Sequence, residues 1–493
     1  MWFCFCKDSQ KKPILTINAH HLSFPTSISH RRNGFYSQKV SHAPFFGNKI
    51  WFFGLLTVIL CSRKVSQAAF LGNSMIIERN TYLNKLIDGL SNKMIKIVTG
   101  LRRSGKSFLL FELFHSYLIK QGVNREHIIE IALDNRLFKD LRDPDRMLHH
   151  ITTSIKDEDT YYVIIDEVQM MDEFVDVLNS LLHIKNIQLY VTGSNSRFLS
   201  KDVATEFRGR GYEIHIYPLS FAEYYSAKGG DKQSCWKEYY TYGGLPQLID
   251  YEGDEAKEEF LSSLLESVYV KDILERHRLR NQEEFQELLR VVASMVGSKF
   301  NATKISNTFK SLKHKTIDRK TIAKYLDYVS DAFIVEQSRL YNIRGKSYIN
   351  TLSKYYFQDV GLRNALLDFR QIEPGHLMEN VIYNELKMRG YRVDVGQVRI
   401  KTRNKNGETV TSDLEVDFVI NQGDKRFYIQ SSDRMPSENK LAQESASLLR
   451  IGDFFARVII VNEDIKSHWN DKGIYIMSLF DFLLGVDSLD NII

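Results

Sequence analysis

Gly100-Leu101-Arg102-Arg103-Ser104-Gly105-Lys106-Ser107 is the stretch that decides the fold. It fits G-x-x-x-x-G-K-[ST], the P-loop pattern, at every fixed position. The apolar residues 94–99 before it predict a short buried strand, and residues 108–114 after it predict a helix. A strand, a glycine-rich loop and a helix in this order form a cradle whose backbone N–H groups face phosphate oxygens. The stretch therefore predicts a triphosphate site.

The fixed residues of the loop have separate expected roles. The glycines let the backbone curl around the phosphates. Lys106 would reach the β- and γ-phosphates, and the Ser107 hydroxyl would ligate Mg²⁺. ATP and Mg²⁺ are thus the expected ligands, and the expected nucleotide-binding residues are Gly100, Arg103, Ser104, Gly105, Lys106, Ser107 and Asp166.

A second motif makes a chance match very improbable. Residues 161–167 read YYVIIDE, an apolar run that ends in two carboxylates, which is the Walker B pattern. Asp166 would hold Mg²⁺ through water, and Glu167 would polarise the attacking water. An acid directly after the Walker B aspartate favours hydrolysis over nucleotide binding alone.

A third apolar run, residues 187–192, predicts another core strand and is followed by polar residues. In ATPases with an extra strand between the P-loop and Walker B strands, a polar residue at this point senses the γ-phosphate. Asn195 fits that role best, with Ser194 as the second choice. The alternative is an ordinary polar loop.

Arg208 and Arg210 lie in the Arg-Gly-Arg-Gly loop that precedes the predicted strand 212–216. An arginine here could act as a finger on the γ-phosphate, in cis or from a neighbouring subunit. That role makes a homo-oligomer an expected assembly. A basic surface loop explains the pattern equally well.

The basic charge of the chain is concentrated near its N-terminus. The whole chain carries a formal +5, but residues 1–74 hold nine Lys or Arg and one acid, so residues 75–493 carry −3. The body is not strongly basic, and only a local patch could indicate nucleic acid. Of the four cysteines only Cys235 lies in the body, which excludes a disulfide framework there and favours a reducing, cytoplasmic location.

Residues 1–74 differ in composition from the rest. The apolar run 51–61 is too short to span a membrane. We expect an N-terminal extension outside the fold, with Met75 as the natural first residue; a membrane anchor is the less favoured alternative. No membrane segment is expected for residues 75–493.

The alternation of strands and helices over residues 94–216 predicts a parallel sheet covered on both faces. The expected strands lie near 94–99, 128–133, 161–166, 188–192 and 212–216. Helical patterns up to residue 276 predict a lid over the nucleotide. Residues 75–280 are accordingly expected to form one ATPase domain with its lid.

Residues 281–345 predict a winged helix. Three helical patterns are followed by residues 333–336 and 346–348, which would supply the wing. The segment is the most basic part of the body, with Lys310, Lys313, His314, Lys315, Arg319, Lys320 and Lys324. Contact with double-stranded DNA is expected slightly ahead of a protein-docking role. Residues 346–493 predict a further α/β unit.

From about Met75 to its end, the chain resembles the prokaryotic AAA+ ATPases that carry a C-terminal domain of uncharacterised function. The resemblance rests on the P-loop, Walker B, Thr192–Ser196 and Arg-Gly-Arg elements and on Tyr-Pro-Leu-Ser-Phe at 217–221, Gly-Gly-Leu-Pro at 243–246 and Glu-Val-Asp-Phe at 415–418. The Pro-Leu-Ser-Phe and Gly-Gly-Leu-Pro elements are much more specific than a P-loop alone. It implies a P-loop NTPase core of AAA+ type with a helical lid, a winged helix, and a C-terminal α/β fold similar to restriction endonucleases.

Endonucleases of this fold need an acid on one strand and acid-x-lysine on the next. Asp417 supplies the first acid, and Glu379 or Glu385 could add a helix carboxylate. Gln430 and Ser432 stand where the second acid and the lysine should be. We therefore expect a degenerate nuclease fold.

Three hypotheses follow from these patterns. The leading one is an ATP hydrolase whose nucleotide state moves the winged-helix and C-terminal module. The second is a nucleotide-dependent switch with negligible turnover, and the third is a nuclease.

Overall fold

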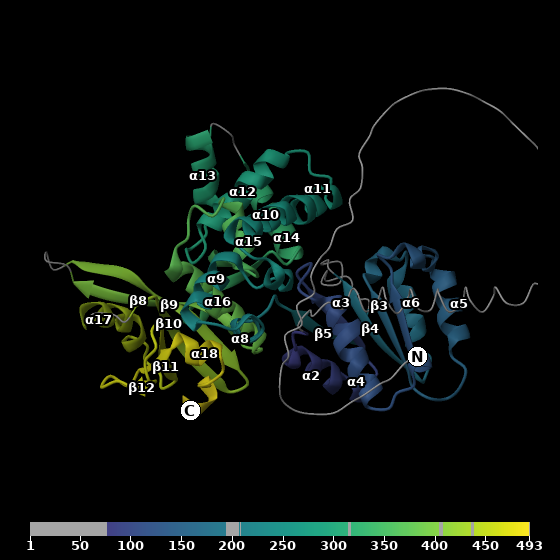
Figure 1. Ribbon diagram of the computed structural model, residues 1–493. Coiled ribbons are helices and arrows are strands. Elements are labelled where there is room, and N and C mark those ends of the chain that lie inside the picture. The colour runs from purple at the N-terminus through teal and green to yellow at the C-terminus, as the bar shows by residue number, and fades with distance from the viewer. Residues whose placement is uncertain are drawn as a thin grey trace, which may run out of the picture. The chain divides into compact units, whose positions relative to one another are not determined.

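The computed structural model describes residues 76–193, 207, 209–313, 317–403, 408–434 and 438–492. The chain divides into two compact units, Met1–Ser74 and Met75–Ile493, and the fold below is that of the second (Figure 1). The expectations for residues 1–74, Ser194, Asn195 and Arg208 lie outside the described residues.

The N-terminal sheet is parallel, as the sequence predicts. Its strands are β1 (Ile95–Gly100), β2 (Ile128–Ala132), β3 (Tyr161–Asp166), β4 (Ile187–Gly193) and β5 (Gly211–Ile216), in the order β2-β3-β4-β1-β5. β4 lies between the P-loop strand β1 and the Walker B strand β3, which confirms the extra strand. Because the strands are parallel, the P-loop and the ends of β3 and β4 meet at one edge of the sheet.

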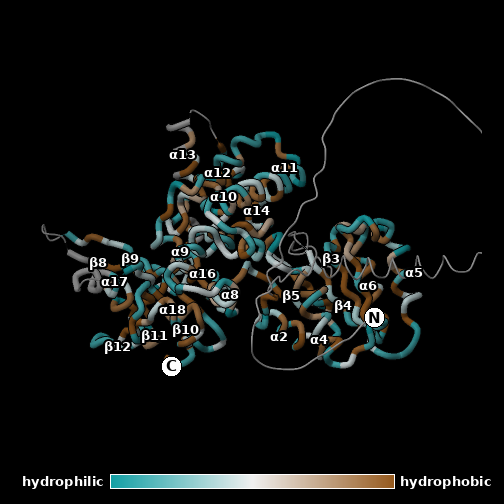
Figure 2. Tube along the Cα trace, viewed as in Figure 1, coloured by the Kyte–Doolittle hydropathy of each residue, from teal (hydrophilic) through white to brown (hydrophobic). Residues whose placement is uncertain are grey.

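Helices cover both faces of this sheet. The helices are α2 (Asn80–Asp88), α5 (Pro144–Ser154), α6 (Phe174–Leu181) and the P-loop helix, which runs without a break through α3 (Lys106–Phe108), η2 (Leu109–Phe114) and α4 (His115–Lys120). Short helical turns are η1 (Gly89–Ser91), η3 (Arg125–His127), η4 (Arg136–Arg142) and η5 (Val168–Met170). α2 and the P-loop helix pack on the face that carries Val98, and α5 and α6 pack on the face that carries Ile97. Strands buried on both faces are continuous apolar runs, which the tube in Figure 2 shows for β3 and β4.

A helical region follows β5. It contains α8 (Phe221–Lys228), α9 (Lys232–Tyr242), η7 (Pro246–Asp250), α10 (Asp254–Leu264), η8 (Leu265–Val270), α11 (Lys271–Arg276), α12 (Gln282–Ser294), α13 (Ala302–Lys313), α14 (Arg319–Asp331) and α15 (Val360–Leu366). Ser220 and Glu223 form a capping box that starts α8. Side chains of α10 to α15 share one apolar core with Leu101 of the P-loop. The helical region therefore packs directly on the P-loop.

The Gly-Gly-Leu-Pro motif is explained by its contact with Asp359. The Gly244 N–H donates to Asp359 Oδ2 at 2.8 Å, while Asp359 Oδ1 accepts from Leu362 N at 3.0 Å and caps α15. A Cβ on Gly243, whose φ is 84°, would lie 2.2 Å from Asp359 Oδ1. Glycine is required because the carboxylate occupies the space of a side chain.

The C-terminal sheet is mixed and is larger than the sequence indicates. Its strands are β6 (Val335–Asn342), β7 (Ser347–Phe357), β8 (Arg392–Arg403), β9 (Thr409–Gln422), β10 (Lys425–Ser432), β11 (Ala456–Val461), β12 (His468–Trp469) and β13 (Tyr475–Ser478), in the order β12-β13-β11-β10-β9-β8-β6-β7. α16 (Pro374–Met388) and α18 (Leu479–Leu483) pack on one face and α17 (Glu438–Leu449) on the other, and η9 (Leu489–Ile492) ends the described chain.

The strand pair expected to form a wing belongs to this sheet instead. β6 pairs with β8 in parallel, with Leu340 opposite Val395, and β7 pairs with β6 at the edge. The apolar pattern of β7 continues to the buried Tyr355, Tyr356 and Phe357, well beyond the expected end at residue 348. The turn between the two strands contains residues 345 and 346, where the sequence places a domain boundary.

Candidate functional site

The P-loop connects the end of β1 to the start of α3. Gly100 has φ 139°, and a Cβ there would lie 2.1 Å from the carbonyl oxygen of Ile216 on β5. Only glycine fits so close to the neighbouring strand. Arg103 also adopts positive φ, at 65°, and its side chain is exposed at the tip of the loop.

The side-chain contacts of Lys106 and Ser104 indicate whether the loop fits a polyphosphate. Lys106 is 4% exposed, and its Nζ donates to the carbonyl oxygens of Gly100 (3.1 Å) and Leu101 (3.0 Å). Burial lowers the pKa of Lys106 to about 8, against the opposing effect of Glu167 and Asp166. Ser104 Oγ is buried and has no hydrogen-bond partner among the described residues. A buried ammonium held by neutral carbonyls and an unsatisfied hydroxyl suit phosphate oxygens.

Asp166 joins the P-loop to the ends of two strands. The Ser107 hydroxyl donates to Asp166 Oδ2 at 2.7 Å, and the Thr192 hydroxyl donates to Asp166 Oδ1. Burial raises the pKa of Asp166, and these two hydroxyl contacts counteract the rise. The two residues expected to hold Mg²⁺, Ser107 and Asp166, are thus brought together.

Thr192 is a functional candidate that sequence reasoning missed. Besides its bond to Asp166, its Oγ1 accepts the backbone N–H of Glu167 at 2.9 Å. One side chain at the end of β4 therefore fixes both Walker B acids. The signal in the sequence is a polar residue near the end of an otherwise apolar strand.

Glu167 lies directly beyond the strand in a left-handed conformation, with φ 51°. The Gln169 side-chain amide donates to Glu167 Oε2. The charge of this carboxylate acts on the pKa of both Lys106 and Asp166, so Glu167 belongs to the electrostatic surroundings of the P-loop lysine.

Arg210 lies at the opposite edge of the sheet from the P-loop. Its backbone contacts the start of β1, since Ile95 N donates to Arg210 O at 2.9 Å, and β5 runs parallel to β1 from Gly211 beside Ile95. A strand rises about 3.3 Å per residue, so Arg210 is roughly 16 Å along the sheet from Gly100. This exposed arginine is too far to contact phosphate in its own P-loop, which removes the expectation of a finger in cis at this residue.

Two side chains outside the motif contact the P-loop backbone. Arg79, just before α2, donates to Ser104 O at 3.0 Å, and Tyr269 of η8 donates to Arg102 O at 2.5 Å. No local pattern marks either residue, since each lies outside the motif it contacts.

The C-terminal sheet contains a buried charge cluster. Lys354, 1% exposed on β7, pairs with Glu379 Oε1 of α16 at 2.8 Å and with Glu415 Oε1 of β9 at 2.5 Å. Burial raises the pKa of Asp417 to about 7, and Glu379 adds to the rise. Glu385, the other expected helix acid, pairs instead with Arg389.

Two residues of the neighbouring strand β10 donate hydrogen bonds to Asp417. Ser431 donates to Asp417 Oδ2 from its backbone N (2.8 Å) and from its hydroxyl (2.7 Å), and Gln430 Nε2 donates to Oδ1 at 3.2 Å. Ser432 is buried and donates to the Arg434 carbonyl. Lys354 was missed because it lies 63 residues before Asp417, in the part of β7 after residue 348 for which the sequence pattern predicted no strand.

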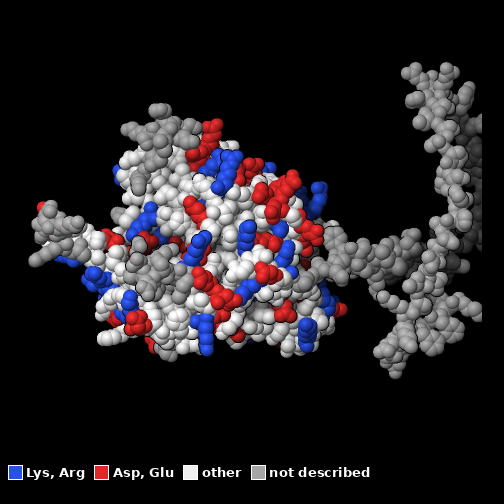
Figure 3. Space-filling model, turned by 60° about the vertical axis from the view of Figure 1, so that its left-hand side comes forward, with Lys and Arg blue, Asp and Glu red and all other residues white. Residues whose placement is uncertain are grey.

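The expected basic patch is only partly described. Arg319, Lys320 and Lys324 are exposed on α14, whereas the side chains of residues 310–316 lie outside the described part. On the face in Figure 3, basic and acidic side chains are interspersed and form no broad field of one sign.

No helix of the described residues is long and apolar enough to span a membrane.

Two family models match the chain. One, described as an AAA domain, matches residues 92–225, and the other, described as a domain of unknown function, matches residues 233–373. The AAA match confirms the P-loop ATPase type of the N-terminal sheet. It covers the P-loop, Walker B and Thr192.

Relatives extend over most of the chain. An uncharacterized protein of Haemophilus influenzae is 33% identical over 417 residues, which is 83% of this chain and 99% of the relative. An uncharacterized protein of Methanocaldococcus jannaschii is 29% identical over 426 residues, with 83% of this chain and 89% of the relative covered. The solved structure of a Walker-type ATPase of Pyrococcus abyssi aligns with a TM-score of 0.41 at 15% identity, over 59% of this chain and 96% of that one, too distant a likeness to bear on function.

Proposed function

The chain belongs to the family of AAA-domain proteins that includes the Haemophilus influenzae relative, and we propose that it binds ATP with Mg²⁺ at the P-loop and hydrolyses it. The single observation that carries the proposal is the contact set around Asp166, in which Ser107 and Thr192 hold the carboxylate and Thr192 also holds the Glu167 backbone. This set joins the nucleotide loop to the acid needed for hydrolysis.

Each residue has a role in the proposed reaction. Lys106 exchanges its contacts with the Gly100 and Leu101 carbonyls for phosphate oxygens. Ser107 and Asp166 would hold Mg²⁺, which when bound neutralises charge on the β- and γ-phosphates. The loop N–H groups orient the phosphates and stabilise the charge that develops on them.

Glu167 is the proposed water-activating residue. It orients a water whose oxygen bonds to the γ-phosphorus while the bond from that phosphorus to the β–γ bridging oxygen breaks. The water proton passes to Glu167 or solvent, and ADP and phosphate leave. Asn195, which follows β4 in the sequence, is the proposed sensor of the γ-phosphate.

Measurement of ATP binding and turnover with the full chain tests the proposal. Wild type should bind a fluorescent ATP analogue and release phosphate with Mg²⁺, and Lys106→Ala should lose both. Lys85→Ala on α2 is a control that removes a lysine from a cation–π contact with Tyr82. Equal binding by wild type and Lys106→Ala would contradict the proposed site.

A switch with negligible turnover is the second candidate, and the Gln169 contact favours it. An amide that engages Glu167 Oε2 competes with a water for that carboxylate. If the chain is a switch, Gln169→Ala should raise a very low basal turnover without changing ATP affinity. A wild-type rate already within the range of active ATPases, unchanged in Gln169→Ala, would remove this candidate.

We further propose that nucleotide-dependent movement of the helical and C-terminal region is coupled to DNA through α14. The exposed Arg319, Lys320 and Lys324 on that helix support contact with phosphates. Double-stranded DNA should stimulate turnover at low salt, and the triple alanine variant should not respond. The same stimulation in the variant would leave α14 without a DNA role and favour a protein partner.

For the C-terminal region we propose a nuclease-like fold without nuclease activity. The Lys354 ammonium occupies the space between Glu379 and Glu415, and Asp417 is held by Ser431 and Gln430. Among the described residues, a group of three or more His, Cys, Asp or Glu side chains with ligand atoms within 4.8 Å of one another is formed by His127, Asp157 and Asp159, far from this cluster in the chain. These contacts support a structural charge network in place of a metal site.

A further inference from the structure

The outward side of the P-loop carries two contacts that the proposed ATPase mechanism does not use. In a trans peptide the C=O and N–H point in opposite directions. A peptide whose N–H faces a phosphate therefore directs its carbonyl away from the nucleotide. Any group that holds the carbonyl also fixes the direction of the N–H.

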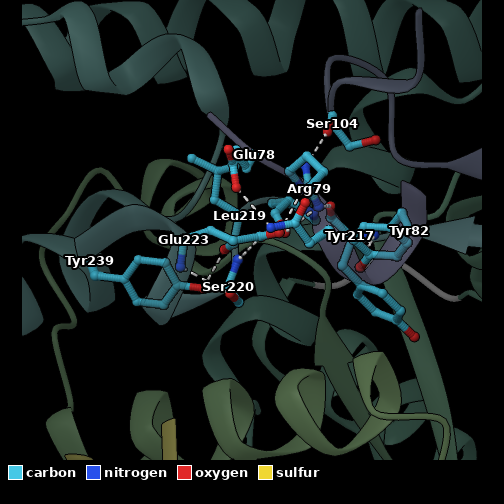
Figure 4. A network of polar contacts seen from close by, with 11 residues as sticks. Glu78, Arg79, Tyr82, Ser104, Tyr217, Leu219, Ser220, Glu223 and Tyr239 are labelled. Atoms are coloured by element: carbon cyan, nitrogen blue, oxygen red, sulfur yellow. Dashed lines mark hydrogen bonds and ion pairs between the residues drawn. The ribbon is translucent and has the colours of Figure 1, made fainter. Parts of the chain in front are cut away.

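Arg79 holds one of these carbonyls. Its Nη1 donates to Ser104 O at 3.0 Å, and Ser104 O belongs to the same peptide as the N–H of Gly105 (Figure 4). The guanidinium is 4% exposed and is itself fixed, since Nε donates to Glu223 Oε1 at 2.9 Å and Nη2 to Tyr217 O at 2.8 Å. It also lies 4.8 Å from the centre of the Tyr82 ring.

The partners of Arg79 are parts of rigid elements. Tyr217 follows β5, and Glu223 is the capping-box acid of α8. Because a planar guanidinium presents its donors in a fixed fork, it can link these elements to Ser104 with one geometry. A lysine at position 79 could make only some of the contacts to Ser104, Tyr217 and Glu223.

Tyr269 holds the second carbonyl. Its hydroxyl donates to Arg102 O at 2.5 Å, and Arg102 O belongs to the same peptide as the N–H of Arg103. The ring is 3% exposed in the core that also contains Leu101. Tyr269 lies in η8, a π-helical turn inside the region that matches the domain of unknown function.

We propose that Arg79 and Tyr269 are positioning residues of the nucleotide site: they hold the Ser104 and Arg102 carbonyls outward so that the Gly105 and Arg103 N–H groups face the phosphates. This inference rests on the proposed ATP site. Tyr269 lies in the region that matches the domain of unknown function, outside residues 92–225 that match the AAA domain. If Tyr269 orients the P-loop backbone, the helical region beyond residue 233 contributes to the nucleotide site.

Nucleotide affinity of the full chain tests this role. Tyr269→Phe removes only the hydroxyl, and Arg79→Lys keeps the charge but loses the fork. Each lost hydrogen bond should weaken binding of a fluorescent ATP analogue and raise KM roughly three- to tenfold. kcat should stay within about twofold, because neither side chain is expected to touch the reacting atoms.

Matched controls separate positioning from general stability. Tyr225→Phe removes a hydroxyl that donates to Gly230 O, and Arg457→Lys changes a guanidinium that donates to the Ile451 and Asp453 carbonyls. These variants should bind ATP like wild type. Tyr269→Phe loses a buried hydrogen bond and Tyr225→Phe an exposed one, so Tyr269→Phe should melt at a somewhat lower temperature. Thermal unfolding of every variant without nucleotide checks that each is folded at the temperature of the binding assay.

The outcomes are distinguishable. ATP binding by Tyr269→Phe and Arg79→Lys at wild-type affinity would overturn the positioning role and leave the ATP site intact. Weakened binding in Tyr225→Phe and Tyr269→Phe alike would also overturn it, since the effect would then be general. Absence of ATP binding by wild type would overturn the proposed function itself.

Discussion

Thr192 illustrates how much of the site depends on single hydroxyl groups. Its Oγ1 donates to Asp166 and accepts from Glu167 N at 2.9 Å, so it sets the position of both acids at once. A polar side chain that is fully buried is stable only because both of its hydrogen bonds are made.

Thr192→Val should therefore reduce both stability and turnover. Valine keeps the shape but leaves Asp166 Oδ1 and the Glu167 N–H without this partner, which costs about 1–3 kcal/mol of unfolding free energy. Thr192→Ser keeps the hydroxyl and should retain most of the activity. Urea unfolding and phosphate release of the two variants check this. Equal stability and equal turnover of Thr192→Val and Thr192→Ser would show that the hydroxyl is not needed.

Asp417 gives a pH-dependent prediction. Burial and Glu379 raise its pKa from 3.8 to about 7, so between these values the folded chain binds a proton that the unfolded chain has lost. The contribution of this group to stability is therefore present at low pH and declines as pH rises through about 7. The side chain that Asp417→Asn introduces cannot ionise. The free energy of unfolding of the variant minus that of wild type should therefore be larger at pH 8 than at pH 5.

Urea midpoints of wild type and Asp417→Asn are compared at pH 5 and pH 8. The difference reports on the cluster of Asp417, Glu379 and Lys354, since the residues outside it are common to both chains. A difference between variant and wild type that is the same at pH 5 and pH 8 would contradict the raised pKa.

At the scale of elements, the strands of the N-terminal sheet could be predicted almost to the residue. β1 and β3 are apolar runs that end in a motif, at Gly100 and Asp166, and strands buried on both faces leave that pattern in the sequence. The residues 333–357 could not be assigned from pattern alone. β6 mixes buried and exposed positions although it lies between β8 and β7, and its pairing with β8 joins residues more than 50 positions apart.

The cluster around Asp417 leads to a prediction about cleavage. Its acids pair with Lys354 or accept hydrogen bonds from Ser431, and an ammonium cannot activate water as a bound metal ion does. Wild type and Asp417→Ala should both leave double-stranded DNA intact in the presence of Mg²⁺, measured on supercoiled plasmid. Cleavage by wild type that is lost in Asp417→Ala would make the nuclease hypothesis the leading one.

At the scale of the whole molecule, the arginines before β5 raise the question of assembly. Arg210 lies at the edge of the sheet away from its own P-loop, where a neighbouring subunit could use it. A local sequence pattern does not show to which end of the sheet a residue belongs. The same holds for Arg79 and Tyr269, which approach the P-loop from 25 and 167 residues away.

If these arginines act between subunits, the Arg208→Ala/Arg210→Ala double variant should lose turnover by roughly 10³-fold or more while it still binds ATP. Mixing it with inactive Lys106→Ala should restore part of the activity, because an intact P-loop then meets intact arginines. Turnover of the double variant within threefold of wild type would identify the loop as basic surface.

Glu167 is the residue that would make this P-loop protein an ATPase, so its substitution is the most direct test of the proposed function. Phosphate release and fluorescent-ATP binding should be measured in parallel on wild type and Glu167→Gln. We expect Glu167→Gln to bind ATP with wild-type affinity and to lose turnover by about 10²-fold or more, because water activation is removed while the phosphate contacts remain. Equal turnover in the two proteins would contradict it.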